Sequence, residues 1–544
     1  MSNPFLNSTQ CIVSTLSPVH IGCGEDYYPT NYVIDDGLLH HFSEEGLLAA
    51  LTLPEKTALS KIAEEYGDDG IKKLQGLIYS KKEKLQFHTT HSVPLSKELE
   101  AFYKSRIGQT SQREGNRRDV NNKLNIARHT FNPYHQTPYF AGSSIKGVIR
   151  TALLNALNDG DPLPKRFDPH REPLGESDKL QKRVLGYQAI SDDPEKDVKG
   201  DPLRLLKIGD ATYQHPDNLN ASEIRFAVNR KNKPSKFQAK GPSQFLECLP
   251  ANRSRSLRFD LTFLADKNSQ YRWTLRDICN ACNEFFVPQL DSELAMLQQL
   301  NYANTAWVTG LEKLLANELS EAFRNQQAFL LRVGQHSGAE SNTLEGVRHI
   351  KIMQGKDNQA KYLPKPTTIW LAANHKDQQH DLLPFGWVLV EIGDVRLDKT
   401  HAFLTDQAKP DYQRQQQLQQ FATQRAEFLA QEQQKQALKA RQVAEDTKQA
   451  RLQAEANRAK ASILATMTDA QRVVFQLKEA MENDQRPDPN GTLRQALTTA
   501  IKQAENWSPA DQADKQALLE IGNALCSLWG KPKKLKDQLK NLQG

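Results

Sequence analysis

Residues 411–462 contain neither glycine nor proline and consist mostly of Gln, Ala, Lys, Arg and Glu. These residue types favour helix, so the segment is expected to form one long helix. Heptad steps from Phe421 and Phe428 reach Lys435 and Gln442, so the continuous apolar seam of a coiled coil is missing. We therefore expect a solvated helical spacer rather than a coiled-coil dimer, with folded domains on either side of it.

The part of the chain before the spacer mixes strand-like and helix-like patterns. CIVSTLSPVHIG, SEIRFAV and SLRFDLTFLA read as strands, and Asp36-Gly37 has the composition of a two-residue hairpin turn. Residues 43–103 are mostly helical in pattern, and SSIKGVIRTALLNAL is an amphipathic helix. The apolar side of that helix carries Ile145, Val148, Ile149, Ala152 and Leu153. Because the elements interleave without regular βαβ spacing, we expect the α+β class with antiparallel sheets.

The residues after the spacer read as a small helical bundle. Thr468 and Gln471 form a capping-box signature, and Ser508-Pro509 is typical of another helix start. ALLEIGNALCSLW supplies an apolar face for packing. The expected domains are 1–200, 201–405, the spacer 406–462 and the bundle 463–544.

Composition restricts the location and the class of protein. No run of about 18 apolar residues is present, and the N-terminus lacks the pattern of a signal peptide, so a cytoplasmic protein without membrane partners is expected. Six cysteines in 544 residues are too few for a disulfide framework. Cys279 and Cys282 form a C-x-x-C, but no second half of a zinc site follows, so both are expected to be buried in a helix.

Net charge does not by itself predict nucleic-acid binding, because 71 Lys and Arg are nearly balanced by 65 Asp and Glu. Local patterns are more informative. The segment RFAVNRKNKPSKFQAK interleaves basic residues with Phe226 and Phe237, which suits phosphate contact and base stacking. A solvated basic loop is the alternative. The basic candidates in this segment are Arg230, Lys231, Lys233 and Lys236.

A second candidate is the GSSIKG turn that starts at Gly142. Glycines permit close approach of a ligand to the backbone, and the N–H groups at the start of the following helix attract anions. Lys146 and Arg150 fall on one side of that helix. Val148 stands where a Walker A loop requires Lys, which disfavours a nucleotide-hydrolysing P-loop. Phosphate contact and an ordinary helix start with surface charges remain open. The candidate residues are Gly142, Ser143, Ser144, Lys146, Gly147 and Arg150.

Two further glycine-rich turns flank histidines. SPVHIGCGE contains His20, Gly22 and Gly24, and VGQHSG contains Gly334 and Gly338. His20 is either a general base for RNA cleavage or a hydrogen-bonded structural residue. No carboxylate pair, Ser/His/Asp order or metal-ligand cluster stands out, so we expect no catalytic residue, no cofactor and no metal.

Taken together, these segments resemble the RAMP superfamily of CRISPR proteins. TLSPVHIGCGEDYYPTNYVID is similar to its N-terminal signature, and PYFAGSSIKGVIRTALLNAL to its G-S-S-I-K-G segment. FLLRVGQHSG is similar to its later glycine-rich loop, and PKPTTIWLA with LLPFGWVLVEI to its closing strands. The order of these segments most resembles the family of the fifth Csm subunit of type III-A effector complexes.

The resemblance implies two ferredoxin-like (RRM-like) domains with helical insertions, ahead of the long helix and the small C-terminal helical domain. It further implies a non-catalytic subunit that binds CRISPR RNA and caps the filament of repeated backbone RAMP subunits near the 3′ end of the guide. The implied partners are CRISPR RNA, target RNA, other type III effector subunits and host nucleases. Two alternatives stay open: a metal-independent endoribonuclease that processes precursor CRISPR RNA, and an adaptor that recruits a nuclease through the C-terminal domain.

Overall fold

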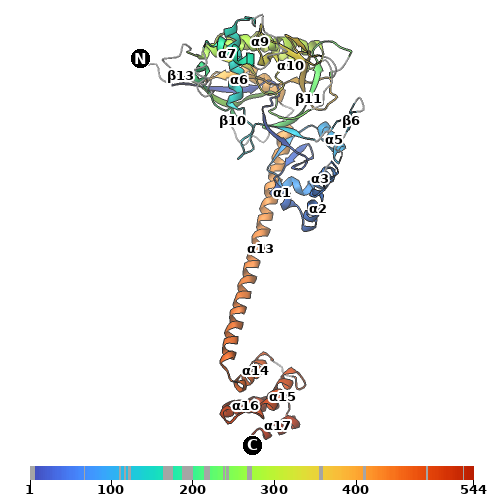
Figure 1. Ribbon diagram of the computed structural model, residues 1–544, viewed down its shortest axis with the longest axis vertical. Coiled ribbons are helices and arrows are strands. Elements are labelled where there is room, and N and C mark those ends of the chain that lie inside the picture. Colours follow the sequence, from blue (N-terminus) through green and yellow to red (C-terminus); the bar gives the residue numbers. More distant parts are fainter. Residues whose placement is uncertain are drawn as a thin grey trace. The chain divides into compact units, whose positions relative to one another are not determined.

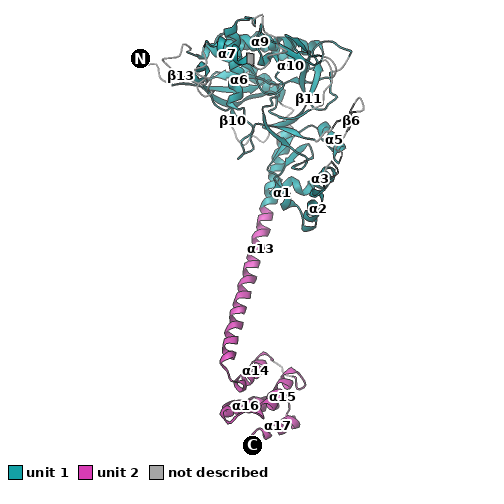
Figure 2. Ribbon diagram, viewed as in Figure 1, with its two compact units in different colours: residues 1–429 teal, residues 430–544 magenta. Residues whose placement is uncertain are grey.

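In the computed structural model the chain forms two compact units, residues 1–429 and residues 430–544 (Figure 2). Each unit is described separately. The structure describes residues 6–65, 68–108, 112–114, 118–120, 124–162, 175–186, 200–213, 221–236, 239, 244–265, 272–353, 359–408, 412–484, 488–530 and 532–543. No helix among these residues is both long enough and apolar enough to cross a lipid bilayer.

The first sheet is built around β1 (Leu6–Thr15), which pairs antiparallel with β13 (Arg253–Leu264) and β19 (Trp387–Ile392). The remaining strands of this sheet also pair antiparallel, with β13 or with β19. They are β9 (Leu206–Ile208), β10 (Thr212–Tyr213) and β14 (Ala328–Arg332). The second half of β1, residues 11–15, is therefore buried between two strands that come from far along the sequence.

The second sheet has the strand order β18-β17-β11-β12-β8-β2. Its neighbours pair antiparallel except β12 and β8, which are parallel. Its strands are β2 (Gly22–Tyr27), β8 (Ile126–His129), β11 (Glu223–Lys231), β12 (Gln244–Cys248), β17 (Thr368–Ala373) and β18 (Leu383–Pro384). Each large sheet takes strands from both sides of residue 200, so the expected boundary there does not separate one sheet from the other. Such long-range pairing has no local sequence signature.

Two long helices, α6 (Gly142–Asn158) and α9 (Leu275–Gln299), pack against each other and against the first sheet (Figure 1). The five apolar residues expected on one side of α6 are all buried, which confirms the amphipathic pattern. Cys279 and Cys282 are fully buried in α9, as predicted. Nearby helices are α7 (Gly175–Val184), α10 (Thr305–Ala316), α11 (Glu318–Arg324) and α12 (Asp398–Ala408).

A smaller three-stranded sheet, β3-β4-β5, carries the N-terminal helices. The predicted hairpin turn is present: Asp36 and Gly37 both have positive φ, 47° and 72°, between β3 (Tyr32–Asp35) and β4 (Leu38–His41). The helices are α1 (Glu44–Ala50), α2 (Leu53–Ala63), α3 (Asp68–Ser80), α4 (Lys82–Leu85) and α5 (Lys97–Arg106). β5 (His91–Pro94) interrupts the helical pattern expected over residues 43–103 because it pairs with β4. Two short hairpins remain, β6 (Gln112–Glu114) with β7 (Arg118–Val120) and β15 (Ile350–Ile352) with β16 (Lys361–Leu363).

Helix α13 (Tyr412–Thr466) confirms the long helix, but its first turns are not solvated. Leu418 is only 4% exposed. The Phe421 ring lies 4.6 Å from that of His40, and the Phe428 ring stacks on Phe87 at 4.8 Å. The apolar positions that begin a heptad pattern therefore pack within the first unit. The expected spacer 406–462 is exposed mainly from Ala430 onward.

The second unit ends in α14 (Asp469–Asn483), α15 (Thr492–Ala504), α16 (Gln512–Leu528) and α17 (Lys533–Asn541). These helices share a core that includes Leu497, Leu518 and Leu525. The capping box predicted at Thr468 is present, with the Thr468 side chain on the Gln471 N–H and the Gln471 side chain on the Thr468 N–H. Ser508 starts the predicted later helix with a second capping box.

Candidate nucleic-acid interface

His20 lies at the junction of the two large sheets and is completely buried. Its Nδ1 lies 2.6 Å from the carbonyl oxygen of Glu247. Because a carbonyl can only accept, Nδ1 carries the proton and Nε2 keeps a lone pair. Nε2 is buried and has no hydrogen-bond partner in the part of the chain that the structure describes. Burial lowers the pKa of His20, so the ring is neutral.

Two of the predicted glycine-rich turns meet at this histidine. The N–H of Gln335 donates to the His20 carbonyl oxygen at 2.8 Å. Gly334 has φ +85°, and a Cβ there would stand 2.2 Å from the same oxygen. A Cβ on Gly22 would stand 3.3 Å from His20 Nε2. The chain therefore requires glycine at residue 334 for backbone approach as well as for its conformation.

His129, which the sequence analysis missed, joins the first turn to the segment before GSSIKG. Its Nδ1 accepts the Ile21 N–H at 3.0 Å, and its Nε2 lies 3.1 Å from the carbonyl oxygen of Tyr139. Burial and the nearby His20 ring lower its pKa well below the usual value. His129 stands at the end of β8, and no local motif marks it in the sequence.

The start of α6 is engaged by the protein's own groups. The Gly142 N–H donates to Asp210 Oδ1 at 2.7 Å, and a Cβ there would stand 2.4 Å from the Ile208 carbonyl oxygen. Lys146 Nζ donates to the Leu206 carbonyl oxygen at 2.8 Å, and burial lowers the pKa of this lysine. The close packing of the turn against β9 thus accounts for the glycine without a ligand.

The Arg150 side chain is also bound by other groups of the protein. Its Nη1 lies 2.6 Å from Asp201 Oδ2, and its Nε donates to Gln181 Oε1 at 2.8 Å. Ser143 and Gly147 are exposed at the start of α6, and Ser144 is half-buried. Of the candidates in this turn and helix, these three small residues remain at the surface. The cations Lys146 and Arg150 are bound by groups of the protein itself.

The basic segment at and after the end of β11 also contains both residues bound within the protein and exposed residues. Arg230 Nη2 donates to the Gln378 carbonyl oxygen at 2.6 Å and to that of Lys376 at 3.1 Å. Lys231 is half-buried at the end of the strand, and Lys233 and Lys236 are exposed. Phe237 and Lys240 lie outside the described residues. Lys233 also lines a cavity of about 550 Å³ with His336 and Gly338, so the structure brings the basic segment and the third turn to one place.

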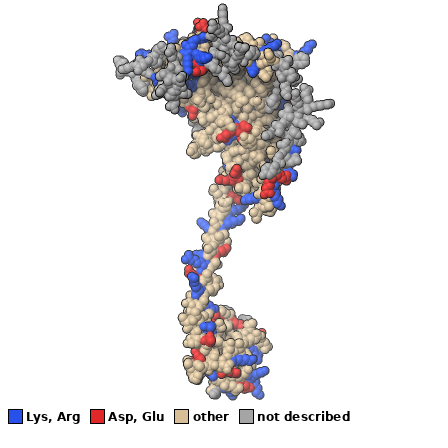
Figure 3. All heavy atoms as spheres, viewed as in Figure 1, with Lys and Arg blue, Asp and Glu red and all other residues tan. Residues whose placement is uncertain are grey.

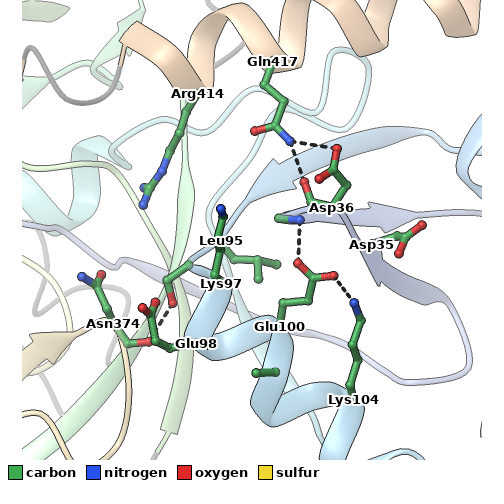
Figure 4. A pocket seen from close by; sticks show the side chains of 13 residues that line it. Asp35, Asp36, Leu95, Lys97, Glu98, Glu100, Lys104, Asn374, Arg414 and Gln417 are labelled. Carbon is green, nitrogen blue, oxygen red and sulfur yellow. Dashed lines mark hydrogen bonds and ion pairs between the residues drawn. The ribbon is translucent and has the colours of Figure 1, made fainter.

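Another cavity, of about 840 Å³, lies where α13 meets the β3–β4 hairpin and α5 (Figure 4). Its charged groups are held in place: Glu100 accepts the Gly37 N–H at 2.8 Å and pairs with Lys104 at 2.6 Å. Gln417 donates to the carbonyl oxygen of Asp36 at 2.6 Å. Four carboxylates and three cations line this cavity, so it has no excess positive charge to attract a phosphate. They belong to Asp35, Asp36, Glu98 and Glu100.

Charge is distributed in small groups. On the face in Figure 3, Lys and Arg gather in patches separated by uncharged surface rather than in one continuous stripe. Within the described part of the chain, no group of three or more His, Cys, Asp or Glu could hold a metal ion. The features suited to nucleic acid are therefore the glycine-rich turns and a few exposed lysines.

Comparison with known proteins assigns the chain to a family. The model of the RAMP superfamily matches residues 12–324. A protein of Methanocaldococcus jannaschii, "CRISPR system Cms protein Csm5", is 30% identical over 199 residues, 36% of this chain and 41% of that protein. The chain therefore matches less than half the length of this relative.

Two solved structures are similar at 18% identity. A chain of "Cryo-EM structure of Csm-crRNA-target RNA ternary complex in type III-A CRISPR-Cas system" has a TM-score of 0.42, covering 70% of this chain and 100% of that chain. "Crystal structure of T.onnurineus Csm5" has a TM-score of 0.39, covering 69% and 99%. The family match extends over more than half of the 544 residues and includes the first two glycine-rich turns. The chain belongs to the RAMP superfamily.

Proposed function

We propose that this chain is a CRISPR RNA-binding subunit of a type III effector complex. In this role it caps the filament of repeated backbone RAMP subunits near the 3′ end of the guide, assists guide maturation and lies close to the target RNA. Membership of the RAMP superfamily and the similarity to Csm5 support the proposal. We further propose that the two large sheets correspond to the two ferredoxin-like domains that the resemblance implies.

The observation that carries the proposal is the junction of the first and third glycine-rich turns at His20. Gly22, Gly24 and Gln335 are exposed beside this junction. Their backbone can approach an RNA phosphate closely because glycine has no side chain to intervene. We propose RNA contacts from these turns, from the exposed start of α6 and from the lysines after β11. These residues are Gly22, Gly24, Ser143, Ser144, Gly147, Lys231, Lys233, Lys236 and Gly338.

The other candidates serve to position those contacts. Their side chains or backbones are buried against the chain itself, as the hydrogen bonds above describe. They are His20, Gly142, Lys146, Arg150, Arg230 and Gly334. Substituting them should disturb the shape of the RNA surface rather than remove a phosphate contact.

We propose that the subunit is not a nuclease. His20 Nε2 has the lone pair that a general base needs, but its burial keeps it away from any phosphodiester. The test is incubation of the purified chain with labelled precursor RNA in chelator, with His20→Ala beside it. Site-specific cleavage that the variant loses would favour the endoribonuclease alternative.

Binding is tested with the purified complex and guide RNA over a range of salt concentrations. Lys233→Ala with Lys236→Ala should lower affinity and reduce the slope of log K against log salt by about one for each phosphate that is no longer neutralised. Lys313→Ala with Lys399→Ala, two other exposed lysines of the first unit, is the control and should leave the slope unchanged. Equal slopes for both variants would refute these contacts.

The second unit favours an additional adaptor role. Beyond Ala430, α13 is almost wholly exposed, and the four following helices have a core of their own. We propose that this unit recruits another protein, such as a nuclease, to the complex. A chain ending at residue 429 should retain guide RNA but lose a partner in pull-downs from the native host. If the chain ending at residue 429 still recovers every partner, the adaptor role is refuted.

A further inference from the structure

The cavity of about 550 Å³ beside the third glycine-rich turn has the size of a small-molecule site. Its walls come from the residues after β11, from α9, from the end of β14 and the turn that follows it, from β15, and from β17 with the residues before it. These elements are distant in sequence. An aromatic ring, a buried cation and several exposed lysines face one space.

The aromatic wall is Trp370, which is half-buried and lines the cavity. His336 stacks on it, with ring centroids 4.5 Å apart and an interplanar angle of 24°. His336 is itself held at Nε2, 3.0 Å from Gln244 Oε1, and its backbone has φ +64°. The indole is therefore fixed in orientation and suited to stacking with a planar ligand.

Arg332 lines the cavity and is only 3% exposed. Its Nη1 pairs with Glu293 at 2.8 Å, and its Nε donates to the Phe385 carbonyl oxygen at 3.1 Å. Nη2 has no acceptor in the described part of the chain. Arg332 therefore contributes a fixed positive charge to the wall of the cavity.

The lysines that line the cavity are exposed, in contrast with Arg332. Lys233, Lys351 and Lys365 have no ion pair within the residues that the structure describes. The two exposed or half-buried carboxylates of the cavity, Glu340 and Glu345, act electrostatically on Arg348, which lies among them. Five cations and three carboxylates line the cavity, so its net charge is +2, which favours an anionic ligand.

We propose that this cavity receives one unstacked nucleotide of the bound RNA, an inference that rests on the proposed RNA-binding function. The base lies against Trp370, with the positive charge of Arg332 beside it. The flanking phosphates lie on Lys233, Lys351 and Lys365. A peptide of a neighbouring subunit fits less well, because an aromatic ring and three lysines in one cavity suit a base with its flanking phosphates.

The test uses the purified complex and a set of guide RNAs, each with one abasic nucleotide at a successive position. With wild-type protein, one position should lower affinity roughly tenfold, because the abasic nucleotide has no base to stack on the aromatic side chain. Trp370→Ala should lower affinity for the intact guide by a similar factor and show no further decrease at that position. Trp370→Phe should restore most of the affinity. Lys313→Ala with Lys399→Ala is the matched surface control, and melting temperatures check that each variant is folded.

The outcomes separate this inference from the proposed function. If wild-type protein binds guide RNA but the abasic series is flat and Trp370→Ala binds normally, the nucleotide pocket is refuted and RNA binding stands. If wild-type protein binds no RNA, both fail. If Trp370→Ala keeps its RNA affinity but loses a protein subunit, the pocket belongs to a protein interface and the inference is overturned.

Discussion

The N–H of Gln335 donates to the carbonyl oxygen of His20 at 2.8 Å, which joins two glycine-rich turns that are far apart in the sequence. His20 is buried and Gln335 is exposed. The turn after β14 therefore rests on the turn between β1 and β2. This hydrogen bond makes the two turns one surface, on which the proposed RNA binding depends.

Gly334→Ala should destabilise the protein strongly. The residue has φ +85°, and a Cβ would meet the His20 carbonyl oxygen at 2.2 Å, so backbone must move. Gly24→Ala is the matched control, because Gly24 has φ +83° with nothing within 4 Å of its Cβ. The control should cost about 1 kcal/mol of unfolding free energy, and Gly334→Ala several times as much. Urea unfolding measures both, and equal decreases would argue against the close approach.

A chain ending at residue 409 should be less stable than one ending at 429. The shorter chain lacks Leu418, Phe421 and the Arg414 Nη1 that lies 3.2 Å from the buried carboxylate of Glu223. Burying two such apolar side chains contributes about 3 kcal/mol. Thermal unfolding of both chains measures the difference. Identical melting temperatures would mean that the first turns of α13 contribute nothing to the first unit.

Stability should fall as the pH falls from 6.5 toward 4, in part through His40. Burial lowers the pKa of His40 to about 4, and its ring lies against Phe421 of α13. The unfolded chain takes up this proton near pH 6.5 and the folded chain does not, so the free energy of unfolding decreases throughout that window. The expected slope is about 1.4 kcal/mol per pH unit for this group. Below about pH 4 His40 is protonated in both states, so it causes no further decrease in the free energy of unfolding.

His40→Gln should reduce that slope while leaving the pH dependence from other groups. Urea unfolding of both proteins at pH 7, 6 and 5 is the measurement. An unchanged slope would mean that His40 titrates alike in the folded and unfolded states.

Arg150→Ala should lower stability by about 1 kcal/mol and leave the salt dependence of RNA binding unchanged. Its guanidinium is half-buried and pairs with Asp201 at 2.6 Å, so it has a partner already. A double-mutant cycle with Asp201→Ala measures the coupling, and salt titrations measure RNA binding. A reduced salt slope for Arg150→Ala would instead indicate that this arginine contacts RNA.

Much of the local structure could be predicted from the sequence. The hairpin at Asp36-Gly37, the buried face of α6, the buried Cys279 and Cys282 and the capping box at Thr468 all appear as expected. Each depends on residues within a few positions of one another, because turn conformation, helical periodicity and helix capping are local. The glycine-rich turns were also found in sequence, and their order along the chain suggested the family.

The tertiary structure alone decided which of those residues face outward. Lys146 and Arg150 share a helix face in sequence, but Leu206 and Asp201 engage them through contacts that no local pattern contains. Phe421 and Phe428 resemble the start of a coiled coil, yet their partners are His40 and Phe87 of the same unit. His129 had no motif, and Trp370 lies in PKPTTIWLA, which indicated only a strand. Side-chain partners and burial depend on strand pairings between distant segments, and sequence periodicity carries no information on which strands will pair.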